Sequence, residues 1–174
     1  MTMGDPVSAV VVRVTLPAPL ERLRRHDDIA AQVGVPAHVT LLFPFMPVAR
    51  LEPSIRGALA EVAATVEPFD VRFAQLGRFP GVVYLVPDPP GPFLAMTEAI
   101  AARFPDYQPY DGAFDEVVPH LTLVESATAR LDEIAAAAQE HLPVAWRVDS
   151  MEVLVERQDQ HWHGRWRIPL GANG

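Results

Sequence analysis

The chain has 174 residues, and 49% of them are apolar, which is enough for a compact core and argues against global disorder. It contains no cysteine, so disulfides, thiolate metal sites and cysteine nucleophiles are excluded together. The formal net charge is −8 and every basic residue is an arginine. This balance disfavours tight binding of long nucleic acids, because such binding depends on a basic surface.

Strands and helices are mixed along the first half of the chain. The apolar stretch Val7–Leu16 is predicted to be a buried strand, since it lacks a basic leader and is too short to span a membrane. A charged, weakly helical segment follows at about 20–33. A strand at 39–45 comes next, and then an amphipathic helix that starts near Pro53.

The second half continues the same mixture. Pro80-Gly81 predicts a hairpin between strands at 71–79 and 82–86. The remaining predicted elements are a helix at about 92–104, a loop at 105–117, a strand at 118–124, a helix with Thr128 as its N-cap, and strands at 145–156 and 162–170. With no flexible linker, this order predicts an α+β (mixed α/β) fold and a single domain of residues 1–174.

One motif occurs twice, as PAHVTL at residues 36–41 and as VPHLTL at residues 118–123. Each copy is a His-x-Thr in an apolar strand, with a proline just upstream and a helix downstream. Because strand side chains alternate between faces, the histidine and threonine of each copy point the same way, and the residue between them faces the core. If the two strands lie close together about a pseudo-twofold axis, four polar side chains converge on one point.

Such a cluster suits hydrolysis of a phosphodiester without a metal. One of His38 and His120, as a neutral imidazole, removes a proton from water or a ribose hydroxyl, while the other, protonated, donates to the departing oxygen. The hydroxyls of Thr40 and Thr122 hydrogen-bond the non-bridging oxygens. A single His-x-Thr is more often a buried structural histidine than a catalytic one, but two copies in equivalent settings favour catalysis.

The sequence resembles the 2H phosphoesterase superfamily, in its 2′-5′ RNA ligase-like branch. The resemblance rests on VPAHVTLLFPF (35–45), LGRFPGVVYL (76–85), VPHLTL (118–123) and the C-terminal EVLVERQ…RWRIPL. It implies a bilobal, pseudo-twofold fold in which two antiparallel-rich sheets line a central cleft and the helices pack outside. It also implies acid–base roles for His38 and His120, phosphate contacts for Thr40 and Thr122, and chemistry on 2′,3′-cyclic phosphates or 2′-5′ linkages. It does not fix which histidine is the base.

Other side chains are weaker candidates. Tyr84 and Phe114 could stack on a nucleobase, with a place in the core as the alternative. Arg78 could contact a phosphate, although most of the arginines are expected at the plain surface. His161 and His163 alternate around a tryptophan with no third ligand nearby, so a metal site is not predicted.

We therefore expect a metal-independent, cofactor-free phosphoesterase that hydrolyses 2′,3′-cyclic phosphodiesters of nucleotides or short RNA ends. It is expected to be a cytoplasmic monomer that does not associate with membranes. Three alternatives stay open: 2′-5′ RNA ligase activity with the same groups, a noncatalytic RNA-end or nucleotide-binding module, and a small phosphodiester substrate outside RNA. The acidic net charge keeps the last of these open.

Overall fold

The computed structural model describes residues 4–171, and within them the chain forms eight strands and five α-helices. The strands are β1 (Ser8–Arg13), β2 (His38–Leu42), β3 (Phe69–Phe79), β4 (Val82–Asp88), β5 (Leu121–Glu125), β6 (Val144–Val148), β7 (Ser150–Glu156) and β8 (Trp162–Pro169). The helices are α1 (Ala18–Asp27), α2 (Ile29–Gln32), α3 (Pro53–Ala64), α4 (Gly91–Arg103) and α5 (Leu131–Gln139), with short 3₁₀ helices η1 (Val48–Arg50) and η2 (Pro109–Gly112). No helix in this part of the chain is long and apolar enough to cross a membrane.

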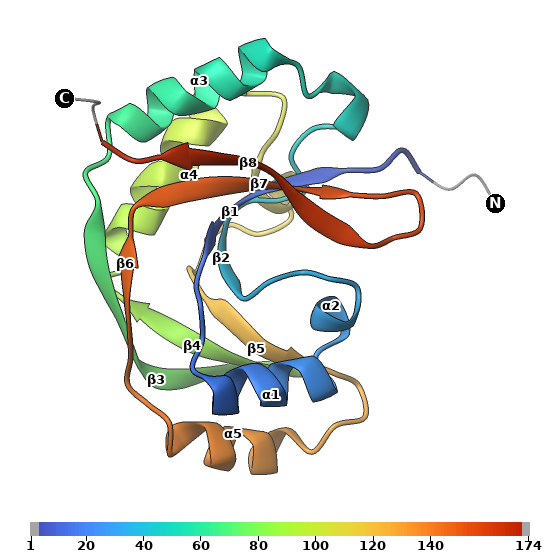
Figure 1. The fold of residues 1–174 in the computed structure, drawn as a ribbon, viewed down its shortest axis with the longest axis vertical. Helices are drawn as coiled ribbons and strands as arrows, with labels where there is room; N and C mark the ends of the chain where they lie inside the picture. Colours follow the sequence, from blue (N-terminus) through green and yellow to red (C-terminus); the bar gives the residue numbers. More distant parts are fainter. Residues whose placement is uncertain (1–3, 172–174) are drawn as a thin grey trace.

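All eight strands belong to one antiparallel sheet in the order β6-β3-β4-β5-β2-β1-β7-β8. The sheet curls, so its two halves, β6-β3-β4-β5 and β2-β1-β7-β8, face different directions (Figure 1). The halves meet at β2 and β5, whose ladder consists of the one register pair Val39 and Leu121. The two sheets expected from the sequence are therefore joined into one by a very short ladder, which we call the β2–β5 seam.

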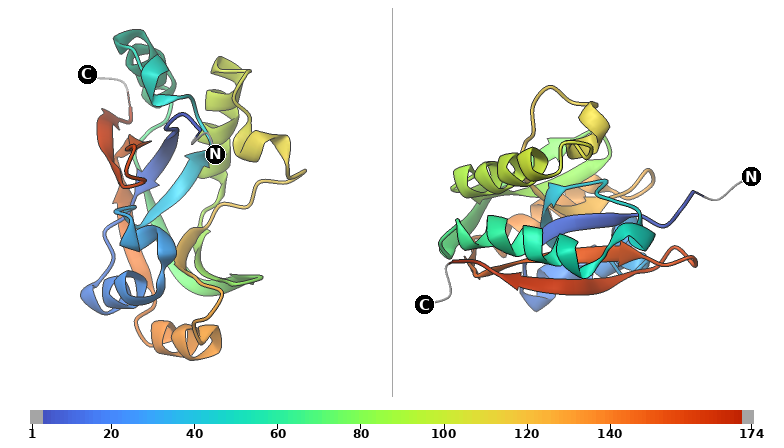
Figure 2. Two further views of the ribbon diagram at one scale, coloured as in Figure 1. Left: turned by 90° about the vertical axis from the view of Figure 1, so that its right-hand side faces the viewer. Right: turned by 90° about the horizontal axis from the view of Figure 1, so that it is seen from above.

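Helices α1, α3, α4 and α5 cover the outer faces of the two halves. Helix α3 packs on β8 and α4 on β2, whereas α1 packs on β5 and α5 on β4. The pair α3 and α4 and the pair α1 and α5 lie at opposite ends of the molecule (Figures 1 and 2). Leu59 and Ala63 of α3 are fully buried in the main core, as the apolar stripe predicted for this helix requires.

Strand β1 shows how side-chain alternation gives the sheet an inner and an outer face. Val10 and Val12 belong to the main core beneath the helices. Val11 points to the inner face, where it joins a small apolar cluster with Leu154 of β7. The register of β1 and β2 pairs Val11 with Thr40, so the polar residues of the first His-x-Thr motif lie on this inner face.

The element pattern read from the sequence is confirmed in most places, including the hairpin at Pro80-Gly81. One predicted strand, 145–156, is divided at Asp149 into β6 and β7. These two strands pair with different partners, β6 with β3 and β7 with β1, so the chain crosses from one half of the sheet to the other at this residue.

The prediction of Thr128 as an N-cap is wrong. Helix α5 starts later, with Arg130 at its N-cap position and no side-chain cap. The hydroxyl of Ser126 accepts hydrogen bonds from the backbone N–H groups of Thr128 (3.2 Å) and Ala129 (3.0 Å). Ser126, one turn before the helix, therefore fills the side-chain acceptor role that was predicted for Thr128.

Candidate active site

His38 begins β2 and shares the inner face of that strand with Thr40. Its ring is held by two partners: Nδ1 lies 2.7 Å from the Pro36 carbonyl oxygen and Nε2 lies 3.1 Å from the Thr40 hydroxyl. Since a carbonyl oxygen can only accept, Nδ1 carries the proton of the neutral ring. Nε2 then holds the free lone pair, and the Thr40 hydroxyl donates to it.

His120 repeats this arrangement at the start of β5. Its Nδ1 lies 2.7 Å from the carbonyl oxygen of Val118, which again is the residue two positions upstream. Leu121 and Leu123 are fully buried on the outer face of β5, so Thr122 shares the inner face with the histidine. In both motifs the backbone therefore fixes the same tautomer and leaves Nε2 as the ring nitrogen available to a substrate.

The β2–β5 seam brings the two motifs face to face. Val39 and Leu121, the middle residues of the motifs, are register partners in an antiparallel pair. Continued by one residue on either side, this register sets His38 opposite Thr122 and Thr40 opposite His120. Directly opposed side chains on one face of such a pair have Cβ atoms about 4.5–5.5 Å apart. The four side chains therefore lie around the seam on the inner face, in an arrangement that we call the square.

The two histidines differ in their surroundings. Burial lowers the pKa of His38 to about 4, because the charged form loses solvation. The positive charges of Arg24 and Arg13, and of His120 when protonated, contribute to this lowering of the pKa, while the hydrogen bond to the Pro36 carbonyl opposes it. His38 is therefore neutral at pH 7 and able to accept a proton there.

A cavity of about 290 Å³ opens on one side of the square. We call it the apolar cavity, because most of the residues that line it are apolar. Its lining consists of His38, Thr40 and Thr122 together with Ala9, Val11, Arg24, Asp28, Ala30, Val33, Val35, Phe43, Glu125, Leu154 and Trp162. Phe43 and Trp162 meet edge to face there, with ring centroids 6.1 Å apart. This space has the size and the walls for an uncharged ring system.

A second cavity, of about 450 Å³, lies beside His120. We call it the aromatic cavity. It is lined by Phe79, Pro80, Tyr110, Phe114, Glu116, Val118 and His120. The Phe79 ring meets the His120 ring edge to face at 5.2 Å, and Tyr110 and Phe114 meet edge to face at 5.5 Å. Such walls offer flat faces on which a nucleobase can stack.

The sequence from residue 12 to residue 160 matches the model of one family, the 2′-5′ RNA ligase superfamily. The chain belongs to this superfamily. Among solved structures it is similar to TT0787 of Thermus thermophilus, with 20% sequence identity, a TM-score of 0.63, and coverage of 96% of this chain and 100% of that one. It is also similar to Escherichia coli LigT complexed with 3′-AMP, with 16% identity, a TM-score of 0.55, and coverage of 95% and 99%. These likenesses show a shared fold. None of the curated proteins searched matches the chain.

In this member of the 2′-5′ RNA ligase superfamily, Tyr84 forms a wall behind His120. Tyr84 is the register partner of Thr122, stacks on Phe79 with ring centroids 4.4 Å apart, and meets the His120 ring at 5.4 Å. Its ring covers Gly77 across the β3–β4 ladder so closely that a Cβ atom at position 77 would overlap the ring. The glycine of the LGRFPG segment is thus needed to seat this tyrosine.

Phe114 and Arg78 lie in different places. Phe114 lines the aromatic cavity, and its side chain is 64% exposed, which leaves its ring open to a ligand. Arg78 forms a 3.0 Å ion pair with Asp132 of α5 and lines neither of the two cavities. Because Phe79 faces the inner side of β3, the adjacent Arg78 faces the outer side. The structure brings Phe114, but not Arg78, to the motif histidines.

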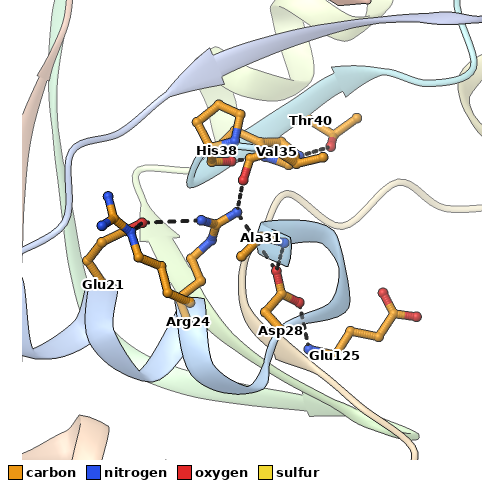
Figure 3. A network of polar contacts seen from close by, with 10 residues as sticks. Glu21, Arg24, Asp28, Ala31, Val35, His38, Thr40 and Glu125 are labelled. Atoms are coloured by element: carbon orange, nitrogen blue, oxygen red, sulfur yellow. Dashed lines mark hydrogen bonds and ion pairs between the residues drawn. The ribbon is translucent and has the colours of Figure 1, made fainter. Parts of the chain in front are cut away.

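Two buried charged residues of the site were not found from the sequence. Arg24 at the end of α1 and Asp28 between α1 and α2 are 3% and 1% exposed and line the apolar cavity (Figure 3). With Leu20 they recur at a spacing of four residues, which places all three on the buried face of the helical segment. That spacing was the available signal, but the many charges of segment 20–33 suggested a solvated helix. In the part of the chain described, no group of three or more His, Asp or Glu side chains is arranged to hold a metal ion.

Proposed function

We propose that the protein is a metal-independent phosphoesterase that hydrolyses 2′,3′-cyclic phosphodiesters of nucleotides or RNA ends. The observation that carries the proposal is the square of His38, Thr40, His120 and Thr122, in which both rings are held by the backbone through Nδ1. Every role that the reaction needs is filled by one of these side chains. We further propose that the protein acts as a cytoplasmic monomer, in keeping with a chain that lacks cysteine.

The proposed reaction uses the two histidines in opposite protonation states. Neutral His38 accepts a proton from water through Nε2 as the water oxygen forms a bond to phosphorus. Protonated His120 gives its Nε2 proton to the ribose oxygen as the bond from that oxygen to phosphorus breaks. The product is a ribose phosphomonoester with one free hydroxyl, and proton exchange with solvent restores both rings. His38 takes the base role because its pKa, lowered by burial to about 4, keeps it neutral at pH 7.

The threonines stabilise the charge that gathers on the non-bridging oxygens. Without substrate, the Thr40 hydroxyl donates to His38 Nε2 at 3.1 Å. When a phosphate enters, this hydroxyl can turn to a phosphate oxygen, and Nε2 is then free to bind the attacking water. Thr122, opposite His38 in the register, supplies the second hydroxyl from the other half of the sheet.

The aromatic cavity is the proposed site for the nucleobase. It adjoins His120, and its Phe114 and Tyr110 rings provide stacking faces. Escherichia coli LigT, which shares the fold, has been crystallised with 3′-AMP and also with ATP. These complexes support a nucleotide as the ligand of the proposed site.

The apolar cavity favours a second candidate function, 2′-5′ RNA ligase activity. It is bounded by His38, Thr40 and Thr122, so a group bound in it lies beside these polar side chains. A nucleoside whose 5′-hydroxyl attacks the cyclic phosphate would fit this position. The same histidines would then remove the proton of the 5′-hydroxyl and protonate the departing ribose oxygen.

The test supplies 2′,3′-cyclic mononucleotides, cyclic-ended oligonucleotides, and pairs of RNA fragments in separate assays, all in EDTA. The proposal expects ring opening of the cyclic substrates. His38→Ala and His120→Ala should each reduce kcat/KM by about 10²–10⁴-fold. His141→Ala serves as the matched control, because this histidine is exposed and lies beyond the end of α5.

The outcomes separate the candidates. Joining of paired fragments without opening of any cyclic substrate would replace the hydrolase by the ligase. Binding of nucleotides without any turnover would leave a noncatalytic binding module. Equal activity of the wild type and both histidine variants would show that the two histidines take no part in the reaction.

A further inference from the structure

Arg24 and Asp28 are charged side chains that the fold buries almost completely, at 3% and 1% exposure. Burial of charge costs several kcal/mol per ion unless hydrogen bonds and an opposite charge offset it. The two are paired, with 3.8 Å between the Arg24 Nη2 and Asp28 Oδ2 atoms. Replacing a buried ion pair by apolar side chains is often neutral or stabilising, so folding stability alone does not account for the pair.

Two further bonds of the pair lead to the segment before β2 and to the end of β5 (Figure 3). Arg24 donates through Nη2 to the backbone carbonyl of Val35. Asp28 accepts from the backbone N–H of Glu125 through Oδ1, at 3.0 Å. Its other oxygen accepts from the N–H of Ala31, also at 3.0 Å, which fixes the carboxylate at the start of α2.

These two backbone contacts are placed symmetrically about the square. Val35 precedes His38 by three residues, and Glu125 follows Thr122 by three residues. Between them, β2 and β5 share the one register pair of the β2–β5 seam. The ion pair is therefore a second connection between the two halves of the sheet. It links the segment that precedes β2 to the end of β5.

The contact with Val35 also acts on the ring of His38. The carbonyl of Val35 belongs to the peptide that enters Pro36, and the Pro36 carbonyl in turn accepts the Nδ1–H of His38 at 2.7 Å. Proline has no N–H with which to anchor this turn. The orientation of the carbonyl that sets the His38 tautomer thus depends on the neighbouring bond from Arg24.

We propose that Arg24 and Asp28 are positioning residues of the active site, which hold the two His-x-Thr strands together and keep His38 in its Nδ1–H tautomer. The role in turnover rests on the proposed function. The role in fixing the tautomer does not, because the tautomer can be observed without substrate.

The decisive variant is the double substitution Arg24→Met and Asp28→Leu, which removes both charges together and leaves neither unpaired. We expect it to fold with a Tm below that of the wild type, because the backbone N–H groups of Glu125 and Ala31 and the carbonyl of Val35 lose their partners, although no charge is left buried and unpaired. We expect kcat on a 2′,3′-cyclic mononucleotide to fall about 10–100-fold with little change in KM, because the reacting groups lose their alignment. Long-range ¹H–¹⁵N spectra at pH 7.5 should show Nδ1–H for His38 in the wild type and a substantial Nε2–H population in the variant.

The matched control is Arg25→Gln. Arg25 lies on the same helix and pairs with the same Glu21 carboxylate that Arg24 reaches, but it is exposed and contacts neither Val35 nor Asp28. This variant should keep the wild-type kcat and the Nδ1–H tautomer. If it changed both quantities as much as the double variant does, the effect would belong to the helix and the proposal would be overturned.

A second variant, Arg24→Lys, covers the case in which the double variant does not fold. Lysine keeps the charge, but its single ammonium lacks the planar fork with which arginine reaches Val35, Asp28 and Glu21 together. It should show the same growth of the Nε2–H tautomer. A folded variant of either kind with the wild-type kcat and only Nδ1–H would overturn the proposal. If the wild type turned over no substrate, the proposed function would fail, and the tautomer would still decide the positioning role.

Discussion

At the residue scale, two identical motifs acquire different chemistry from their neighbours. His38 and His120 share the tautomer-setting hydrogen bond to the carbonyl two residues upstream. His38 is also desolvated beside Arg24 and Arg13, and its pKa falls to about 4. The repeated sequence predicted both side chains and their common face, because strand alternation is a local rule. It could not favour His38 over His120 as the proposed base, because the groups that lower the pKa of His38 come from other elements.

The lowered pKa of His38 makes folding stability depend on pH. In the unfolded chain a histidine titrates near 6.5, whereas folded His38 binds its proton only near pH 4. As pH falls through this window the unfolded state binds the proton first, so the free energy of unfolding decreases. Urea unfolding at pH 7.5, 6.0 and 5.0 should show this decrease. In His38→Gln the decrease should be smaller, and an unchanged slope in that variant would refute the assignment of the titration to His38.

Phe114 offers a test of the nucleobase site at a single residue. Stacking of a base on an aromatic side chain contributes about 1–3 kcal/mol by alanine substitution. Phe114→Leu, which keeps apolar bulk but loses the flat face, should raise KM for cyclic nucleotides about ten-fold with kcat little changed. Phe114→Trp should keep KM near the wild-type value. If the leucine and tryptophan variants behave alike, the base does not stack on residue 114.

At the element scale, the β3–β4 hairpin shows why the LGRFPG segment contains its first glycine. Gly77 lies opposite Tyr84, whose ring occupies the space that a Cβ atom would take. Gly77→Ala should therefore destabilise the protein and move Tyr84 away from His120. In a Tyr84→Ala background the same substitution should be neutral or stabilising, by up to about 1 kcal/mol, because glycine is unfavourable in a strand. A double-mutant cycle measured by urea unfolding gives the coupling, and additive effects would contradict this packing account.

The elements also show which features of the fold could not be predicted from the sequence. Local rules predicted the succession of strands and helices along the chain, the amphipathic α3 and the hairpin at Pro80-Gly81, because each of these depends on residues that are near in sequence. The division of 145–156 at Asp149 was missed, since the two pieces are separated by their pairing partners and not by any turn signal. The burial of Arg24 and Asp28 was missed because their partners lie outside the helical segment. Arg24 bonds to Val35, in the segment before β2, and Asp28 bonds to Glu125, at the end of β5.

At the scale of the whole molecule, the fold is two four-stranded halves that meet at the two His-x-Thr motifs. The mixed α+β class and the pseudo-twofold arrangement were predictable from the repeated strand-plus-helix unit and from the resemblance to a known superfamily. The joining of both halves into one sheet was not, because it depends on the single register pair between Val39 and Leu121. The apolar cavity lies against His38, Thr40 and Thr122, and the aromatic cavity lies against His120.

The measurement that tests the central claim most directly is the pH dependence of kcat/KM on a 2′,3′-cyclic mononucleotide for the wild type, His38→Ala and His120→Ala. The account predicts a bell-shaped wild-type profile whose acid limb lies well below pH 6.5, because the pKa of His38 is lowered to about 4. In His38→Ala the residual activity should lose the acid limb, whereas His120→Ala, which keeps His38, should retain it. A wild-type profile that both variants reproduce, limb for limb, would contradict acid–base catalysis by these two histidines.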